Sequence, residues 1–249
     1  MKRFWLFLFV LLTVGMTQVS AQKKWSFDLG LGASLNTGNV NNCNIINDAS
    51  IERNDSIVAL DFHHKLIYSA LIQKNDMGRK WEETNFEVNG GVKMDLYQYG
   101  KYSPFLACEI LTNKYKGYDL KASGLVGLKF RLFTKPSVYD YSISAAFVYD
   151  RTEFTDKTHL LSDNYRISIR PKIKQKIAEN LTLYHCTFFQ PSILDLHDFI
   201  INTQTKLQTH INKKLFLDLS FTYEYRSLIP TENYRHHDLL TEVSLRLKI

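Results

Sequence analysis

The sequence predicts an all-β fold: a single antiparallel, up-and-down transmembrane β-barrel of about twelve strands. Three observations lead to this prediction. Apolar and polar residues alternate along one segment after another, as in strands with one apolar and one polar face. Many segments run for about ten residues or more, which is long for a soluble protein and suits a tilted strand in a bilayer. Short and longer connections also tend to alternate along the chain, as in outer-membrane barrels.

The final hairpin, residues 214–249, shows the alternation most clearly in both of its arms. One antiparallel register places Asp218 opposite Arg246 and Arg226 opposite Asp238. Opposite charges that face each other on the polar side would help to hold this register. A shift by two residues keeps the same faces and stays open as an alternative.

Similar signals predict ten further strands before this hairpin. A polar loop is expected at residues 73–80. Pro171 lies in the middle of its strand and donates no ladder hydrogen bond, and a bulge there would reconcile it with the strand. Longer connections are expected after the third, seventh, ninth and eleventh strands. The ten strands are expected at about residues 25–36, 42–52, 58–68, 86–96, 102–113, 122–132, 139–150, 165–177, 181–190 and 201–211.

The N-terminus predicts export from the cytoplasm. Lys2 and Arg3 precede an apolar run at residues 4–16, and small residues end at Ala21. This is the pattern of a signal peptide, residues 1–21, cleaved to leave one barrel domain at residues 22–249. Cleavage lowers the formal net charge from +6 to +4, and the remaining basic residues are scattered, so nucleic acid is not an expected partner. We expect the mature chain in the cell outer membrane.

Alternation alone does not decide which face of the barrel points inward. A soluble periplasmic ligand-binding barrel would bury the apolar set, whereas a membrane barrel turns it toward lipid. Strand length, strand number and aromatic residues near predicted strand ends favour lipid. Against it stand Pro171 and the final residue, Ile249, which is not aromatic.

The polar face carries the candidate functional residues, because it would line the lumen of a membrane barrel. We favour an interior in which paired charges fill a narrow lumen and stabilise its wall. The functional alternative is a narrow, weakly anion-preferring pore. The residues expected to line the lumen are Lys129, Arg131, Asp140, Arg166, Arg170, Lys172, Asp218, Glu224, Arg226, Glu242 and Arg246.

Other reactive residues show no catalytic or metal-binding spacing. The three cysteines, Cys43, Cys108 and Cys186, are far apart in the sequence, and a disulfide between two of them stays open. His63 and His64 are adjacent on a strand and would point to opposite faces. No spacing pairs a serine with a histidine, so we expect no enzyme, metal or cofactor, with a lipid-acting hydrolase as the alternative. The residues such a hydrolase would draw on include Ser142, Ser168, His185 and His210.

At the level of whole patterns, the chain resembles the DUF481 family, predicted outer-membrane proteins of unknown function in Gram-negative bacteria. The resemblance rests on residues 34–39, which end in Thr37-Gly38-Asn39, on Gln190-Pro191-Ser192 with Asp198, and on residues 223–226 followed by Pro230 and His237-Asp238. It implies an outer-membrane barrel without a known activity. The expected partners are outer-membrane lipid and the outer-membrane assembly machinery. The function we expect is a narrow small-solute channel or a structural component of the envelope, with an unknown ligand.

Overall fold

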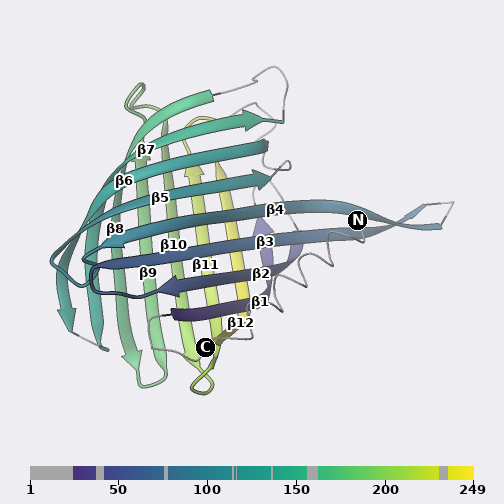
Figure 1. Ribbon diagram of the computed structural model, residues 1–249. Helices are drawn as coiled ribbons and strands as arrows, with labels where there is room; N and C mark the ends of the chain where they lie inside the picture. Colours follow the sequence, from purple (N-terminus) through teal and green to yellow (C-terminus); the bar gives the residue numbers. More distant parts are fainter. Residues whose placement is uncertain are drawn as a thin grey trace.

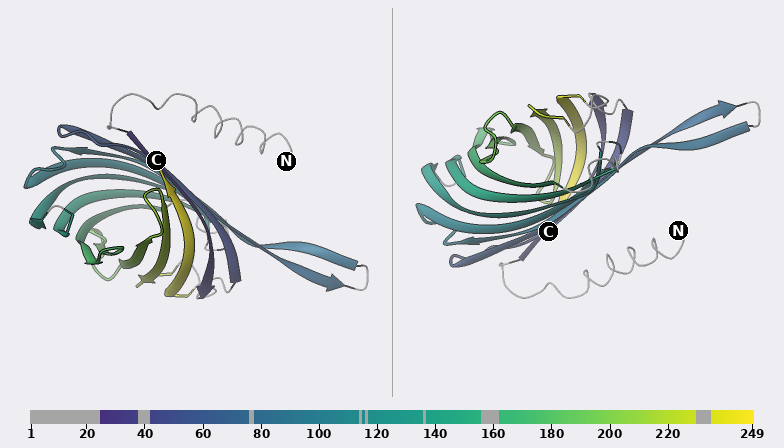
Figure 2. Two further views of the ribbon diagram at one scale, coloured as in Figure 1. Left: turned by 90° about the horizontal axis from the view of Figure 1, so that it is seen from below. Right: turned by 90° about the horizontal axis from the view of Figure 1, so that it is seen from above.

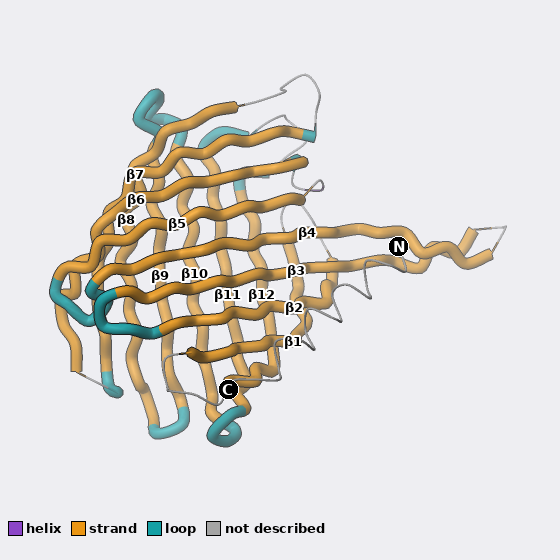
Figure 3. Tube along the Cα trace, in the orientation of Figure 1, coloured by secondary structure: helices purple, strands orange, loops and turns teal. Residues whose placement is uncertain are grey.

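The chain forms a closed barrel of antiparallel strands (Figure 1). This computed structural model confirms the predicted fold class, because each strand pairs with the next along the chain and β1 pairs with β12 to close the ring. Figure 2 shows the curved wall of the barrel from below and from above the view of Figure 1, and Figure 3 shows that strands make up most of the described chain. The predicted signal peptide, residues 1–21, lies outside the described residues. The structure describes residues 25–37, 42–75, 78–113, 115, 117–135, 137–155, 162–229 and 235–249.

Most strands begin and end within a few residues of their predicted bounds. The twelve strands are β1 (Trp25–Thr37), β2 (Asn42–Arg53), β3 (Val58–Asn75), β4 (Gly78–Leu96), β5 (Tyr102–Asn113), β6 (Tyr118–Lys135), β7 (Tyr139–Phe154), β8 (Ser162–Ala178), β9 (Leu181–Pro191), β10 (Phe199–His210), β11 (Leu215–Arg226) and β12 (His237–Lys248).

The strands turn their apolar side outward and their polar side inward. On β12, Val243 and Leu245 are 49% and 46% exposed, whereas Ser244 between them and Glu242 before them are buried. Exposed Leu, Ile, Val and Phe side chains occur on strand after strand around the barrel. Such a surface fits the hydrocarbon of a bilayer rather than water. The alternative of a soluble barrel with its apolar set inside does not fit this arrangement.

The hairpin of β3 and β4 extends far beyond the other strands (Figure 1). The polar loop predicted at residues 73–80 is wrong, because the two strands stay paired from Val58↔Leu96 as far as Asn75↔Gly78. The β2–β3 pairing ends at Tyr68, so β3 continues from Ser69 beside β4 alone. Seven residues at about 3.3 Å each extend the hairpin by roughly 23 Å. A ladder between two strands can continue without an apolar face, which is why alternation did not reveal this extension.

The register of the last hairpin differs by two residues from the predicted one. Asp218 lies opposite Ser244, and Glu224 lies opposite Asp238. The open alternative of a two-residue shift is therefore the correct register. The faces of both strands are unchanged by it, and the long side chain of Arg246 still reaches Asp218 diagonally, with Nε 2.8 Å from Oδ2.

The expected bulge at Pro171 is also wrong. Pro171 lies opposite Ile143 in an uninterrupted β7–β8 register. On its other side, the β8–β9 pairing passes from Ile169↔Phe189 to Lys172↔Cys186 without a change of register. The strand therefore accommodates Pro171 by an interruption of the β8–β9 pairing at this residue, and no extra residue is inserted.

The connections follow the predicted alternation in part. Residues 155–161, 192–198 and 227–236 form the longer connections after β7, β9 and β11, whereas the connection expected to be long after β3 joins Asn75 to Gly78. We call the end of the barrel with these three connections the long-loop end. No helix in the described part of the chain is long and apolar enough to cross a membrane.

We predict that a charge on the outer face destabilises the barrel according to its depth. Val243→Lys, at the middle of β12, should lower the free energy of unfolding in lipid vesicles by about 2–4 kcal/mol. The matched variant Leu247→Lys, near the end of the same strand, should lose about 1 kcal/mol or less. Denaturant titration, followed by the heat-dependent gel mobility of the folded barrel, measures both. Equal losses for the two variants would contradict a lipid-facing surface.

Candidate functional site: the charged interior of the barrel

Arg246 binds three carboxylates from three other strands inside the barrel. Its Nε lies 2.8 Å from Asp218 on β11, its Nη1 2.9 Å from Asp28 on β1 and its Nη2 2.8 Å from Asp48 on β2. Asp218 is fully buried and also lies 3.6 Å from Nζ of Lys206 on β10. These contacts connect β10, β11, β12, β1 and β2 through charges that compensate one another, as buried charges require.

The contact between Arg246 and Asp48 passes over β1, and glycine makes this possible. Gly30 lies opposite Arg246 on one side and opposite Asp48 on the other. A Cβ atom at Gly30 would collide with the carboxylate of Asp48. The missing side chain therefore leaves room for an ion pair between strands that are not neighbours in the sheet.

Lys65 and Glu242 form a second ion pair that passes over intervening strands. Nζ of Lys65 on β3 lies 2.7 Å from Oε2 of Glu242 on β12. Both β1 and β2 separate these strands in the sheet. Side chains that meet over two strands do so within the interior of the barrel.

On another part of the wall, ion pairs connect β4 with β6 and β6 with β7. Asp95 lies 2.5 Å from Nζ of Lys93 and 3.6 Å from Nζ of Lys129. Nε of Arg131 lies 3.0 Å from Asp140. These pairs compensate much of the positive charge that the sequence concentrates on β6.

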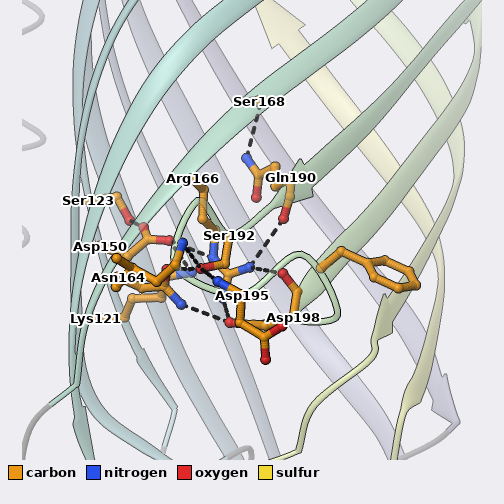
Figure 4. Close-up of polar contacts among 12 residues, drawn as sticks. Lys121, Ser123, Asp150, Asn164, Arg166, Ser168, Gln190, Ser192, Asp195 and Asp198 are labelled. Carbon is orange, nitrogen blue, oxygen red and sulfur yellow. Dashed lines mark hydrogen bonds and ion pairs between the residues drawn. The ribbon is translucent and has the colours of Figure 1, made fainter.

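At the long-loop end, Arg166 on β8 binds the connection between β9 and β10 (Figure 4). Its Nη2 lies 2.6 Å from Oδ2 of Asp198, and its Nη1 donates to the carbonyl oxygens of Gln190 at 3.1 Å and Asp198 at 3.2 Å. Its Nε lies 3.5 Å from Asp150, which also has Nζ of Lys121 at 3.6 Å. Arg166 is buried, and these partners offset the cost of burying its charge.

The motif residues Gln190, Ser192 and Asp198 all take part in this anchoring. Oγ of Ser192 donates to Oδ1 of Asn164 at 2.7 Å, and Nδ2 of Asn164 donates to Asp198 at 2.8 Å. Nε2 of Gln190 donates to Oγ of Ser168 at 3.3 Å. Figure 4 shows these contacts converging around Arg166. The motif therefore fixes the β9–β10 connection to β8.

Arg226 narrows the interior at the same end. The Cζ atom of Arg226 on β11 lies 4.9 Å from the ring centroid of Tyr118 on β6, although these strands are five positions apart in the closed sheet. Nε of Arg226 also contacts Glu224 at 2.5 Å. Because the guanidinium reaches toward the opposite wall, it leaves less room for a solute at this point.

A cavity of about 470 Å³ lies further inside the barrel. Five cationic side chains line it, against the carboxylates of Asp48 and Glu242. Three of the five, Lys65, Lys206 and Arg246, form the ion pairs described above, whereas Arg170 and Lys172 form none with a described carboxylate. Its further lining includes Tyr184, Cys186, Phe188, Gln204, Ser220 and Thr222.

Arg170 is held by neutral groups. Its Nε donates to Oγ of Ser144 at 3.1 Å, and its Cζ lies 5.6 Å from the ring centroid of Phe105 and 5.3 Å from that of Phe188. Lys172 lies two residues further along β8 and is exposed to solvent. Among the five cations that line this cavity, Arg170 and Lys172 are therefore the two without a carboxylate partner in the described chain.

Among the residues predicted to line the lumen, Arg170 and Lys172 are thus the exceptions, because each of the others forms an ion pair. Sequence reasoning missed several partners. Asp28 and Asp48 lie on polar faces that alternation could have identified. Asp198 lies in a connection, where no periodicity reveals the direction of a side chain.

The other candidate residues form separate contacts. Nδ1 of His185 lies 2.9 Å from Oγ1 of Thr205, and the ring of His210 packs edge-on against Phe216. Cys43, Cys108 and Cys186 are free thiols. His63 lies 3.8 Å from Asp61, whereas Nε2 of His64 lies 3.0 Å from Asn47. The described residues contain no group of three His, Cys, Asp or Glu that could hold a metal ion.

We predict that loss of Arg246 destabilises the barrel more than loss of a neighbouring cation. Arg246→Gln leaves Asp28, Asp48 and Asp218 without their shared partner, so the free energy of unfolding should fall by about 3–5 kcal/mol. The matched variant Lys248→Gln removes a weaker contact, 4.0 Å from Asp28, and should cost about 1 kcal/mol or less. Equal losses in denaturant titration would contradict the role of the Arg246 cluster.

We also predict that Asp198 protects the β9–β10 connection from proteolysis. Leu194 and Leu196 are 70% and 74% exposed there and are targets for chymotrypsin. Asp198→Ala removes the charged contact to Arg166, and cleavage should become about tenfold faster. Asp195→Ala is the control, because it leaves the contacts of Arg166 in place. Mass spectrometry of the fragments identifies the cleaved bond, and similar rates for the two variants would exclude the anchoring role.

Solved structures with the same fold include several outer-membrane barrels. The NanC porin has a TM-score of 0.56 and 10% sequence identity, and the match covers 89% of this chain and 100% of NanC. A bacterial polysaccharide outer membrane secretin has a TM-score of 0.51 and 8% identity, covering 92% of this chain and 100% of the secretin. The translocator domain of the autotransporter NalP from Neisseria meningitidis has a TM-score of 0.50 and 8% identity, covering 96% and 92%. At these identities the likeness shows the fold alone.

No curated protein matches the chain. The family described as "Protein of unknown function, DUF481" matches residues 29–249, which include all of β2 to β12 and most of β1. This range contains the Gln190-Pro191-Ser192 motif and the charged interior. The chain therefore belongs to the DUF481 family.

Proposed function

We propose that this protein is a narrow outer-membrane channel that prefers small anions. The observation that carries the proposal is the cavity lined by Arg170 and Lys172, whose charges have no carboxylate partner among the described residues. Inside a channel, uncompensated wall charges attract ions of opposite sign and repel ions of the same sign. The preference thus follows from cations on the wall that remain available to a solute.

The interior cations that have carboxylate partners support the proposal by contrast with Arg170 and Lys172. Arg246, Lys65 and Arg166 each have close carboxylate partners from other elements, so they stabilise the wall and add little net field. A barrel with only such pairs would suit a structural component of the envelope. Arg170 and Lys172 distinguish a channel from that alternative.

The location and the partners form part of the same proposal. The exposed apolar belt suits lipid, and the fold is that of the NanC porin. We infer that the N-terminal segment directs export and is cleaved after Ala21. We also infer that the outer-membrane assembly machinery inserts the barrel into the membrane. Outer-membrane lipid then covers the outward side chains.

We predict that wild-type protein in a planar bilayer passes chloride in preference to potassium and that Arg170→Gln/Lys172→Gln loses this preference. One cation about 4 Å from a passing anion in water contributes about 1 kcal/mol, equivalent to about a fivefold change in occupancy. Because the variant removes two cations, the ratio of chloride to potassium permeability should fall by at least about this factor. The reversal potential in a potassium chloride gradient measures it.

The matched control is Lys176→Gln. It removes one positive charge from β8 near the turn, at an exposed residue outside the cavity lining, so the reversal potential should stay close to that of the wild type. An equal shift for the control would show that the total charge sets the preference. A folded wild-type barrel without conductance would contradict the channel and favour the structural role.

A further inference from the structure

We propose that Arg170 and Lys172 form a discrete binding site for the carboxylate of a small organic acid. The inference deepens the proposed channel function and shares its site, but it concerns equilibrium binding, which needs no conduction. It rests on the geometry of the two side chains and on the cavity into which they open.

The orientation of the Arg170 guanidinium is restricted from three sides. Ser144 lies directly opposite Arg170 in the β7–β8 ladder and accepts a hydrogen bond from Nε at 3.1 Å. The rings of Phe105 and Phe188 lie within 5.6 Å and 5.3 Å of Cζ. Phe105 is buried, so it is a fixed neighbour. The guanidinium is therefore positioned before any solute arrives, which lowers the entropy lost on binding.

The two terminal nitrogens of Arg170 point to a carboxylate rather than to chloride. Within the described chain, Nη1 and Nη2 donate to no protein acceptor, whereas Nε is occupied by Ser144. A planar guanidinium binds a planar carboxylate through two parallel hydrogen bonds, which a spherical ion does not form. Lys172 follows two residues later on the same face, roughly 7 Å along β8, and adds a second positive charge.

The remaining walls of the cavity suit the body of an organic acid. Tyr184 and Phe188 offer aromatic surface, while Gln204, Ser220 and Thr222 offer neutral hydrogen-bonding groups. A volume of about 470 Å³ falls in the range of small-molecule sites. Cations on β8 and neutral polar groups on β10 and β11 thus provide different environments for the two ends of one solute.

The test uses benzoate as the probe, with the refolded full-length mature barrel in detergent. Saturation-transfer difference NMR records the benzoate ring protons, and the part of the signal displaced by excess acetate defines binding at a carboxylate site. We expect this part to saturate with benzoate concentration. Benzyl alcohol, which lacks the charge, should give no acetate-sensitive signal. The same result for both probes would overturn the proposal.

Arg170→Lys is the decisive variant, because it keeps the charge and removes the planar fork. We expect benzoate affinity about tenfold lower than in the wild type, while the chloride preference of the channel stays within about twofold. Ser144→Ala, which frees the guanidinium, should weaken binding less, and Lys176→Gln should leave it unchanged. The heat-dependent gel mobility confirms that each variant is folded, and Ser144→Ala carries the test if Arg170→Lys does not fold.

The outcomes separate this proposal from the channel function. Wild-type affinity in Arg170→Lys would overturn the carboxylate site and leave an anion-preferring channel in place. Displacement of benzoate by inorganic phosphate at lower concentrations than by acetate would also overturn it, in favour of a general oxyanion site. Saturable, acetate-sensitive binding in a barrel without conductance would support the site and refute the channel.

Discussion

Closure of the sheet between β1 and β12 is the contact on which the remaining structure depends. In hydrocarbon, an open strand edge would leave backbone N–H and C=O groups without partners. The ladder runs from Asp28↔Lys248 to Thr37↔Leu239, and Phe27 and Ile249 exchange two further backbone hydrogen bonds beyond it. The C-terminal residue is not aromatic, yet it is fully part of this closure.

Closure also creates the main charge cluster of the interior. Asp28 and Asp48 come from the start of the chain and Arg246 from its end, and they meet because β12 lies beside β1. Gly30 between them leaves the space that the Arg246 side chain needs to reach Asp48. The ends of the chain are thus joined through backbone pairing on the wall and through ion pairs inside it.

The division between paired and unpaired charges gives the interior two roles. Paired groups such as Arg166 with Asp198 hold connections and strands in place, and removing one partner leaves the other uncompensated. Arg170 and Lys172 on β8 stabilise the wall through no such pair in the described chain. Ser144 and two aromatic rings position Arg170, and Lys172 follows it two residues later on the same strand. The charge of both is available to a solute in the cavity.

Local pattern was enough to identify the strands, because alternation with a period of two is a property of each segment alone. It also separated the apolar from the polar face, and so found residues such as Arg246 and Lys172. The extension of β3 and β4 beyond the other strands was missed, because a ladder between two strands can continue without an apolar face. Alternation also did not predict the partners of Arg170, because these lie on other strands. It did not predict the role of Asp198, because this residue lies in a connection, where alternation does not apply.

Only the closed barrel shows which face of each strand points outward. Alternating residues suit either a soluble barrel or a membrane barrel, and the structure distinguishes them by exposing Val243 and burying Glu242. The same is true of register, because a shift of two residues preserves every face and changes only which charges meet. Alternation is a local property of each strand. The tertiary structure decides which side chains face each other inside the barrel, because only closure of the twelve strands creates an opposing wall. The ion pairs that pass over strands and the uncompensated charge both depend on this closure.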